Sequence, residues 1–175
     1  LSLGMTLMMV RVQKSTEEQQ KEGLVKQINL SEQLFAALAA INQPFVFEVS
    51  VSHASELINF YLAVPKQSTD FAIRQIQGLF PTAKVDEVSD YNIFGHNSEA
   101  SSAYLTLRDS YMLPLRTYKE AEVDTFAPIA STLSKLKDVG EGASLQIVMV
   151  PAAKETKNLV VYAIDKLRKG ETIKK

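Results

Sequence analysis

Residues that carry catalytic chemistry are few in this sequence, and they are widely spaced. Cysteine is absent from the 175 residues, which excludes disulfides, thiol catalysis and cysteine-based zinc sites. The two histidines, His53 and His96, lie far apart in turn-like or polar stretches, so a two-histidine metal site requires the fold to bring them together. No serine occupies a G-x-S-x-G elbow or lies near a histidine with an evident orienting acid, and a serine hydrolase is therefore rejected.

Carboxylates gather at two places, around Asp86 to Asp90 and around Glu120 to Asp124. Paired carboxylates act as general acids and bases or hold a divalent ion. Each cluster lies at the end of a predicted strand or helix, where solvated loop charge and helix capping also explain it. One hypothesis for function is therefore a small enzyme with a carboxylate-lined pocket. It requires four carboxylates to converge on one concave site: Asp86, Asp90, Glu120 and Asp124.

Gly140 and Gly142 come closest to a phosphate-binding loop. They stand in the segment DVGEGAS, between a predicted helix and a predicted strand, and they lack the GxxxxGK[ST] spacing. The pattern favours a turn that ends a helix. We therefore expect no catalytic residue, no metal and no cofactor in this chain.

Basic and aromatic residues alternate in the run RDSYMLPLRTYKE, from Arg108 to Glu120. Such interleaving binds single-stranded nucleic acid by stacking and phosphate contacts, and it is equally typical of an ordinary strand pair with an exposed polar row. The tail from Lys166 to Lys175 is also basic. Its charges can complement the dipole of a solvated helix end, or they can contact an anionic membrane surface or phosphates. The candidate nucleic-acid contacts are Arg108, Tyr111, Arg116, Tyr118 and Lys119.

The composition is that of a globular protein with a substantial core. Hydrophobic residues make up 46% and charged residues 22%, and the net charge of -1 gives no general attraction to nucleic acid. No run of 18 apolar residues is present. The opening LSLGMTLMMV is apolar and does not begin with methionine. It is expected to form a first strand, and it also resembles the cut edge of a longer polypeptide in which a membrane segment came first.

The stretch from Leu7 to Val88 predicts the order β-α-β-β-α-β. Apolar residues recur every second position in the strands and every third or fourth position in the helices. This is the order of a ferredoxin-like unit, an antiparallel sheet with both helices on one face. The second row of the central hairpin, with Val46, Tyr61 and Ala63, is not wholly polar, which indicates partial cover of the other face. The strands are expected at 7–12, 45–51, 58–64 and 83–88.

The helices of this first unit have predicted boundaries. Residues 13–28 form a polar linker, or a frayed helix in their first part, before a helix capped by Asn29 or Ser31 and ended by Asn42. The second helix is capped by Ser68 or Thr69 and stopped by Pro81.

A second, related β(β)-α-β-α unit is expected from residue 103 to residue 175, after an interdomain loop at 91–102 and a first unit at 1–90. Strands, or one bent strand, are predicted at 103–108 and 111–118, and a helix follows Asp124. Residues 145–150, LQIVMV, are apolar enough for a central strand buried on both faces. The last helix is expected at about 153–169.

Several segments resemble the N-terminal region of predicted type IV secretion or conjugative transfer ATPases, of the coupling-protein or HerA–FtsK-like kind, from uncultured and candidate-phylum bacteria. The resemblance covers Met8 to about Ala153 and has no signature of reactive residues. It rests on MMVRVQKS, SEQLFAALAAI, FVFEVSV, NFYLAVPKQSTDFAIRQIQGLFPTAKVDEVSDY and LPLRTYKEAEVDTFAPIASTLSKLKDVGEGASLQIVMVPA.

In such proteins a membrane segment precedes a region like this one, and a P-loop motor domain follows it. The present sequence has no Walker A or Walker B motif and no membrane span, so ATP hydrolysis is not carried over to any residue. The resemblance implies a non-catalytic assembly domain, held at the cytoplasmic side of the bacterial inner membrane, with other ATPase or secretion subunits or its own copies as partners. The alternative is a nucleic-acid-binding module that uses the stripe from Arg108 to Lys119 and the basic C-terminal tail.

Overall fold

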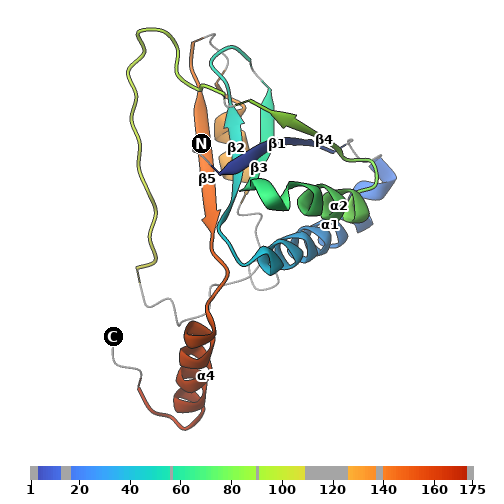
Figure 1. Cartoon of the computed structure of the whole chain (residues 1–175). Helices are drawn as coiled ribbons and strands as arrows, with labels where there is room; N and C mark the ends of the chain where they lie inside the picture. Colours follow the sequence, from blue (N-terminus) through green and yellow to red (C-terminus); the bar gives the residue numbers. More distant parts are fainter. Residues whose placement is uncertain are drawn as a thin grey trace. The chain divides into compact units, whose positions relative to one another are not determined.

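The computed structural model describes residues 4–12, 17–55, 57–89, 91–108, 126–136 and 140–172. It shows an α+β protein with a five-stranded antiparallel sheet and four α-helices in that part of the chain (Figure 1). Contacts divide the chain into two compact units, one of Leu1–Ser98 with Thr132–Pro151 and one of Glu99–Ser131 with Ala152–Lys175. The break after Ser98 falls inside the loop expected at 91–102.

The sheet of the first unit confirms the ferredoxin-like order. Its strands lie in the order β4-β1-β3-β2-β5, and each pairs antiparallel with its neighbours. In a β-α-β-β-α-β unit β3 lies between β1 and β2, and the crossover through the second helix brings β4 to the other side of β1, which gives the 4-1-3-2 core seen here. The five strands are β1 (Met5–Arg11), β2 (Phe45–Val51), β3 (Ile58–Pro65), β4 (Lys84–Val88) and β5 (Ala143–Met149).

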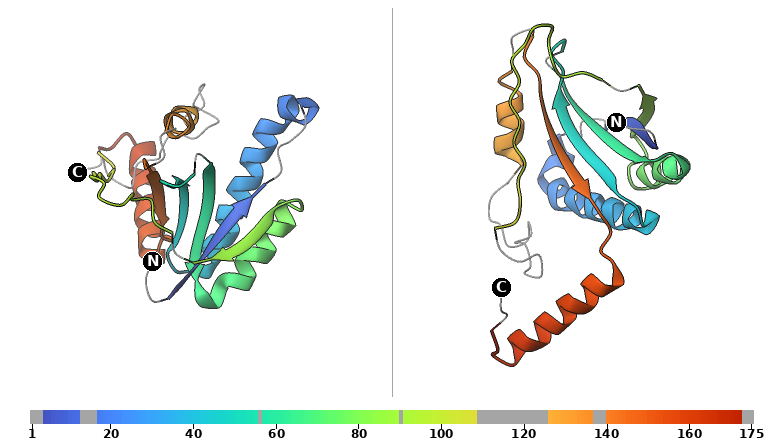
Figure 2. Two further views of the ribbon diagram at one scale, coloured as in Figure 1. Left: turned by 90° about the horizontal axis from the view of Figure 1, so that it is seen from above. Right: turned by 60° about the vertical axis from the view of Figure 1, so that its left-hand side comes forward.

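The register gives the sheet two different faces. Phe47 lies opposite Leu62 and Ile147, and Met8 lies opposite Leu62, so one face is apolar across all its central strands. Because side chains alternate along a strand, the residues between these point to the other face. Helices α1 (Glu17–Leu38) and α2 (Thr69–Leu79) lie side by side on the apolar face (Figure 2).

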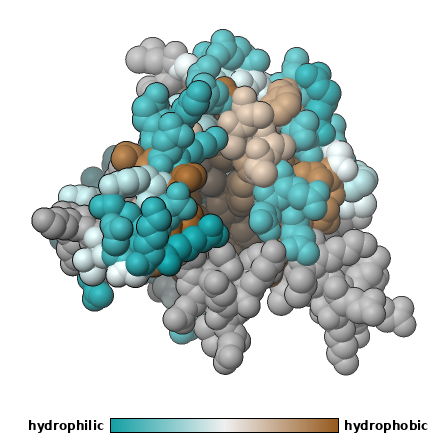
Figure 3. Space-filling view, turned by 90° about the horizontal axis from the view of Figure 1, so that it is seen from below, coloured by the Kyte–Doolittle hydropathy of each residue, from teal (hydrophilic) through white to brown (hydrophobic). Residues whose placement is uncertain are grey.

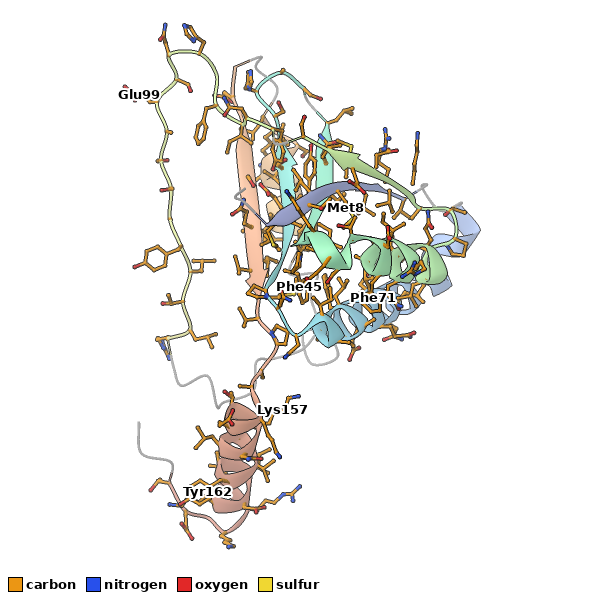
Figure 4. The ribbon with its side chains drawn as sticks, viewed as in Figure 1. Met8, Phe45, Phe71, Glu99, Lys157 and Tyr162 are labelled. Atoms are coloured by element: carbon orange, nitrogen blue, oxygen red, sulfur yellow. The ribbon has the colours of Figure 1, made fainter. Side chains whose placement is uncertain are left out.

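The core forms between this face and the two helices. Met8 of β1, Phe45 of β2 and Leu62 of β3 meet Ile76 of α2 there, and all four are buried (Figure 4). Fully burying such a side chain stabilises the fold by about 1.5–3 kcal/mol. Phe35 of α1 is partly buried against the same cluster.

The first helix begins earlier than the sequence predicted. Glu17 starts α1, so residues 17–28 are its first turns. The helical alternative for this stretch is therefore correct, whereas the linker and a cap at Asn29 or Ser31 are wrong. Helix formation through this polar run reflects cooperative extension from the packed C-terminal half. The end is as expected: the short helix η1 (Ala39–Ile41) stops at Asn42, whose φ of 55° is left-handed.

The second helix keeps its predicted place. Ser68 is the residue before α2, although its side chain makes no capping hydrogen bond. The Thr69 hydroxyl instead donates to the Lys66 carbonyl, with 2.9 Å between the two oxygens. Lys66 begins the short helix η2 (Lys66–Ser68), and Thr69 follows its last residue. The helix ends at Leu79, ahead of Pro81, as predicted.

The later part of the chain confirms the α-β-α succession and corrects two predicted strands. Residues 103–108 are exposed and belong to no strand, while 111–118 lie outside the described residues. The predicted central strand at 145–150 is β5, which lies at the edge of the sheet beside β2. Burial on both faces is therefore wrong, since residues 146–148 are exposed. The apolar run reflects an edge strand with one face over the core.

The two remaining helices are α3 (Ala127–Leu133) and α4 (Lys154–Arg168). The end of α3 at Leu133 comes well before Gly140, so the two glycines do not end this helix as predicted. The helix α4 confirms the one expected at 153–169. Of its predicted inward residues, Ala163 is buried, whereas Leu159 and Leu167 are exposed.

Candidate interaction surfaces

Most of the predicted nucleic-acid stripe falls outside the described residues. Only Arg108 is described, at an exposed position after the break between the two units. The other four, Tyr111, Arg116, Tyr118 and Lys119, lie between residues 109 and 125 and stay untested. At the other basic segment, Lys166 and Arg168 occupy the last turn of α4, the end that favours positive charge.

The carboxylates do not form a site in the described part of the chain. Asp86 lies on β4 and pairs with Arg11 of β1, and its second oxygen is 4.0 Å from the Lys84 Nζ. Asp90, Glu120 and Asp124 lie outside the described residues. Among the residues that are described, no group of three or more potential metal ligands comes together.

The sheet face away from the helices holds a polar cluster that the sequence did not single out. Glu48 on β2 is only 4% exposed, although it is an acid. Its Oε1 accepts hydrogen bonds from the hydroxyls of Tyr91 and Ser144, and its Oε2 accepts one from Gln146 at 3.0 Å. We call this set, with Ser50 and Tyr61, the far-face cluster. A buried acid is stable only when its oxygens are hydrogen-bonded in this way.

Two tyrosines cover the cluster. The rings of Tyr61 and Tyr91 stack with their centroids 4.4 Å apart and their planes 13° apart. Burial is the larger cause and the hydrogen bond to Glu48 the next, and together they raise the pKa of the Tyr91 phenol well above its usual value. The pKa of Tyr61 is also raised, mainly by burial and to a smaller extent by the charge of Glu48. Both phenols keep their protons at neutral pH, and Tyr91 donates its hydrogen to Glu48.

One hydroxyl in the far-face cluster is poorly satisfied. Ser50 is 1% exposed, and its Oγ has no hydrogen-bond partner among the described residues. It lies near enough to Tyr91 to oppose part of the rise in the pKa of that phenol, but not in the geometry of a hydrogen bond. An unpaired buried hydroxyl carries a desolvation cost.

The far-face cluster joins three parts of the first unit. It ties β2 to the start of β5 through Ser144 and to the loop after β4 through Tyr91. Nucleic-acid-binding sheets of this general order present exposed aromatic rings on which bases stack. Here the Tyr61 ring is buried under Tyr91 and borders an acid, so this ring is not exposed for a base to stack on. The mixed row of Val46, Tyr61 and Ala63 was the signal in the sequence that this face would be covered.

Three loops meet at one end of the sheet, beside this cluster. The Gly140 N–H donates to the His53 carbonyl at 2.9 Å, and the His53 ring nitrogen Nδ1 lies 3.2 Å from the Asn92 carbonyl. A Cβ on Gly142 would stand 2.1 Å from the Ile93 carbonyl oxygen. Gly142 therefore serves a close approach of two backbones rather than a helix stop. His53 is a loop contact, and His96 is exposed.

The two edges of the sheet differ in how they are protected. The outer strand β4 is short and carries three charges, at Lys84, Asp86 and Glu87. Charged residues and short length are the usual means by which proteins keep edge strands from pairing with other chains. The outer strand β5, with sequence ASLQIVM, is longer and has no charge and no proline. The described residues place no further strand beside it.

The second unit exposes many apolar side chains. Leu105 is 93% exposed in the segment before residue 109. Figure 4 shows Tyr162 projecting from α4, where the Lys166 Nζ lies 5.1 Å from its ring centroid. In the space-filling view, hydrophilic residues dominate and hydrophobic ones show in patches between them (Figure 3). The exposed apolar residues of this unit include Tyr104, Leu105, Leu107, Leu159, Val161, Tyr162, Ile164 and Leu167.

Comparisons with known proteins leave the family open. No family model, no curated protein and no solved structure matches this chain. Within the part of the chain that is described, no helix is long and apolar enough to cross a bilayer. The class that the fold defines is an α+β protein with a ferredoxin-like sheet extended by a fifth strand.

Proposed function

We propose that this chain is a non-catalytic assembly domain of a membrane-associated type IV secretion or conjugative DNA-transfer ATPase, and that it acts by protein–protein contact. The sequence resemblance supports the parent machine. The observation that carries the contact role is the exposed apolar surface of α4, where Val161 and Tyr162 are each 59% exposed. Exposed apolar patches of this kind mark protein or membrane interaction sites.

The partner under this proposal is another subunit of the same machine, the ATPase motor in particular. The contact lies on α4, and the domain is held at the cytoplasmic side of the inner membrane by its parent protein. The far-face cluster has a structural role in this proposal, because its acid and its phenols are already bonded to one another. No reaction is assigned to the chain.

The test is a binding measurement between the full chain and purified subunits of a type IV secretion machine, including the coupling ATPase, by biolayer interferometry. We expect saturable binding that Val161→Glu weakens, because the substitution places a charge in the apolar contact. Leu57→Glu is the matched control, since Leu57 is an exposed leucine in the first unit, and it should leave binding unchanged. Absence of binding to every subunit would remove the proposal.

A further inference from the structure

We propose that the outer edge of β5 pairs antiparallel with β5 of a second copy of this chain, so that two five-stranded sheets become one. The proposal rests on β5, an edge strand of the sheet in the first unit. It concerns a different surface from the one assigned above to the secretion partner, and it stands without that assignment. The partner is inferred from the backbone groups and the uncharged side chains of β5.

The backbone supplies the first argument. A strand at the edge of a sheet offers a row of N–H and C=O groups on its outer side, a template for another strand. For β5 that row extends over Ala143–Met149, and the described residues place no strand against it. The side chains in the second half of the strand are exposed, with Ile147 at 44% and Val148 at 62%.

The contrast between the two edges supplies the second argument. At β4, the charges of Lys84, Asp86 and Glu87 oppose strand addition. At β5, neither charge nor proline interrupts the strand, and Pro151 comes only after its end. Exposed, uncharged edges of this kind pair or aggregate unless something covers them. The difference within one sheet indicates that the β5 edge is kept open for a partner strand.

The sequence of β5 favours its own copy as that partner. When a two-fold axis normal to the sheet relates two antiparallel strands, the side chains of opposed residues point to the same face of the joined sheet. The row of Leu145, Ile147 and Met149, which continues the apolar face over the core, therefore meets the same row of the second copy. Like charges directly opposite each other destabilise such pairs, and this strand has none to oppose.

The oligomeric state tests the proposal. Sedimentation velocity of the full chain over a wide concentration range should show a concentration-dependent dimer. Val148→Lys should weaken the dimer by about tenfold or more, because lysine on an edge strand opposes pairing. Val161→Lys is the matched control, since Val161 has similar exposure but lies on α4, and it should leave the dimer intact. A chain that stays monomeric throughout, or a dimer lost only with Val161→Lys, would overturn the proposal.

The pairing geometry has its own test, which does not depend on stability. Because the chain has no cysteine, single cysteines report proximity without background. We expect Gln146→Cys, Ile147→Cys or Val148→Cys to form an intermolecular disulfide under mild oxidation, at the position nearest the two-fold axis, while Val161→Cys does not. No cross-link at any of the three positions, with the chain folded by circular dichroism, would refute β5 pairing. Binding to a secretion subunit could still be present in that case, so the two proposals fail separately.

Discussion

The ring of Tyr91 stacks on the ring of Tyr61, with 4.4 Å between their centroids, and the Tyr91 hydroxyl donates to Glu48 beside it. This contact fastens the loop after β4 onto the sheet face away from the helices. It joins residues 43 positions apart and covers an acid that would otherwise be exposed. The part of the far face around Glu48 and Tyr61 is therefore covered by its own chain.

Stability should fall at alkaline pH. The folded state raises the pKa of Tyr91, by burial first and then by the hydrogen bond to Glu48. The stabilisation is fully present below the unfolded pKa of about 10 and is lost as pH rises through the folded value. Urea unfolding between neutral pH and about pH 11 should show this decline, and Tyr91→Phe should make it shallower.

Tyr104→Phe is the control for this pH series. Tyr104 is exposed, so its replacement should leave the pH dependence unchanged, while the titration of lysines affects both variants equally. If Tyr91→Phe and Tyr104→Phe have the same pH profile, the phenol of Tyr91 does not contribute to the alkaline decline. Tyr61, whose pKa burial also raises, contributes to the decline that remains, together with the lysines.

Removal of the buried acid should destabilise the fold. Glu48→Ala deprives Tyr91, Ser144 and Gln146 of their acceptor, and each donor left unsatisfied costs about 1–3 kcal/mol if it stays buried. We expect the free energy of unfolding to fall by at least about 1–3 kcal/mol. Glu87→Ala, at an exposed acid on β4, should change it by no more than about 0.5 kcal/mol. Equal effects of the two variants would mean that water satisfies the donors.

The two serines of the far-face cluster should respond in opposite ways. Ser144→Ala removes a hydroxyl that donates to Glu48 and should lower the free energy of unfolding by about 0.5–1.5 kcal/mol. Ser50→Ala removes a buried hydroxyl with no hydrogen-bond partner among the described residues, so it should be neutral or stabilising. Chemical denaturation of both variants measures the difference. A clear loss with Ser50→Ala would show that its hydroxyl is bonded in solution.

Glycines in the loop and in the helix should also behave differently. Gly142→Ala places a Cβ 2.1 Å from the Ile93 carbonyl oxygen, closer than contact distance, so the loops at that end of the sheet must move apart. Gly78→Ala, within α2, meets nothing within 4 Å and should stabilise by about 0.4–1 kcal/mol. Thermal unfolding should therefore show a lower Tm for Gly142→Ala and a higher Tm for Gly78→Ala. Two shifts of the same sign would contradict this assignment.

Local patterns were sufficient to predict much of the first unit. The period-two rows of FVFEVSV and INFYLAVP predicted the hairpin of β2 and β3, and the structure has it with the apolar rows on one face. The start of α1 was missed because residues 17–23 carry no apolar period, while the helical turns that follow extend the helix through them. Whether the stripe from Arg108 to Lys119 binds nucleic acid stays a prediction.

The sequence by itself determined the order of the elements, the apolar face of the hairpin and the absence of thiol chemistry. These follow from side-chain type and spacing, which are local. Only the tertiary structure decided that residues 143–149 are an edge strand beside β2 and that Glu48 meets Tyr91 and Ser144. Those pairings join residues far apart in the chain, and their free energy comes from burial and hydrogen bonds that exist only once the sheet has formed.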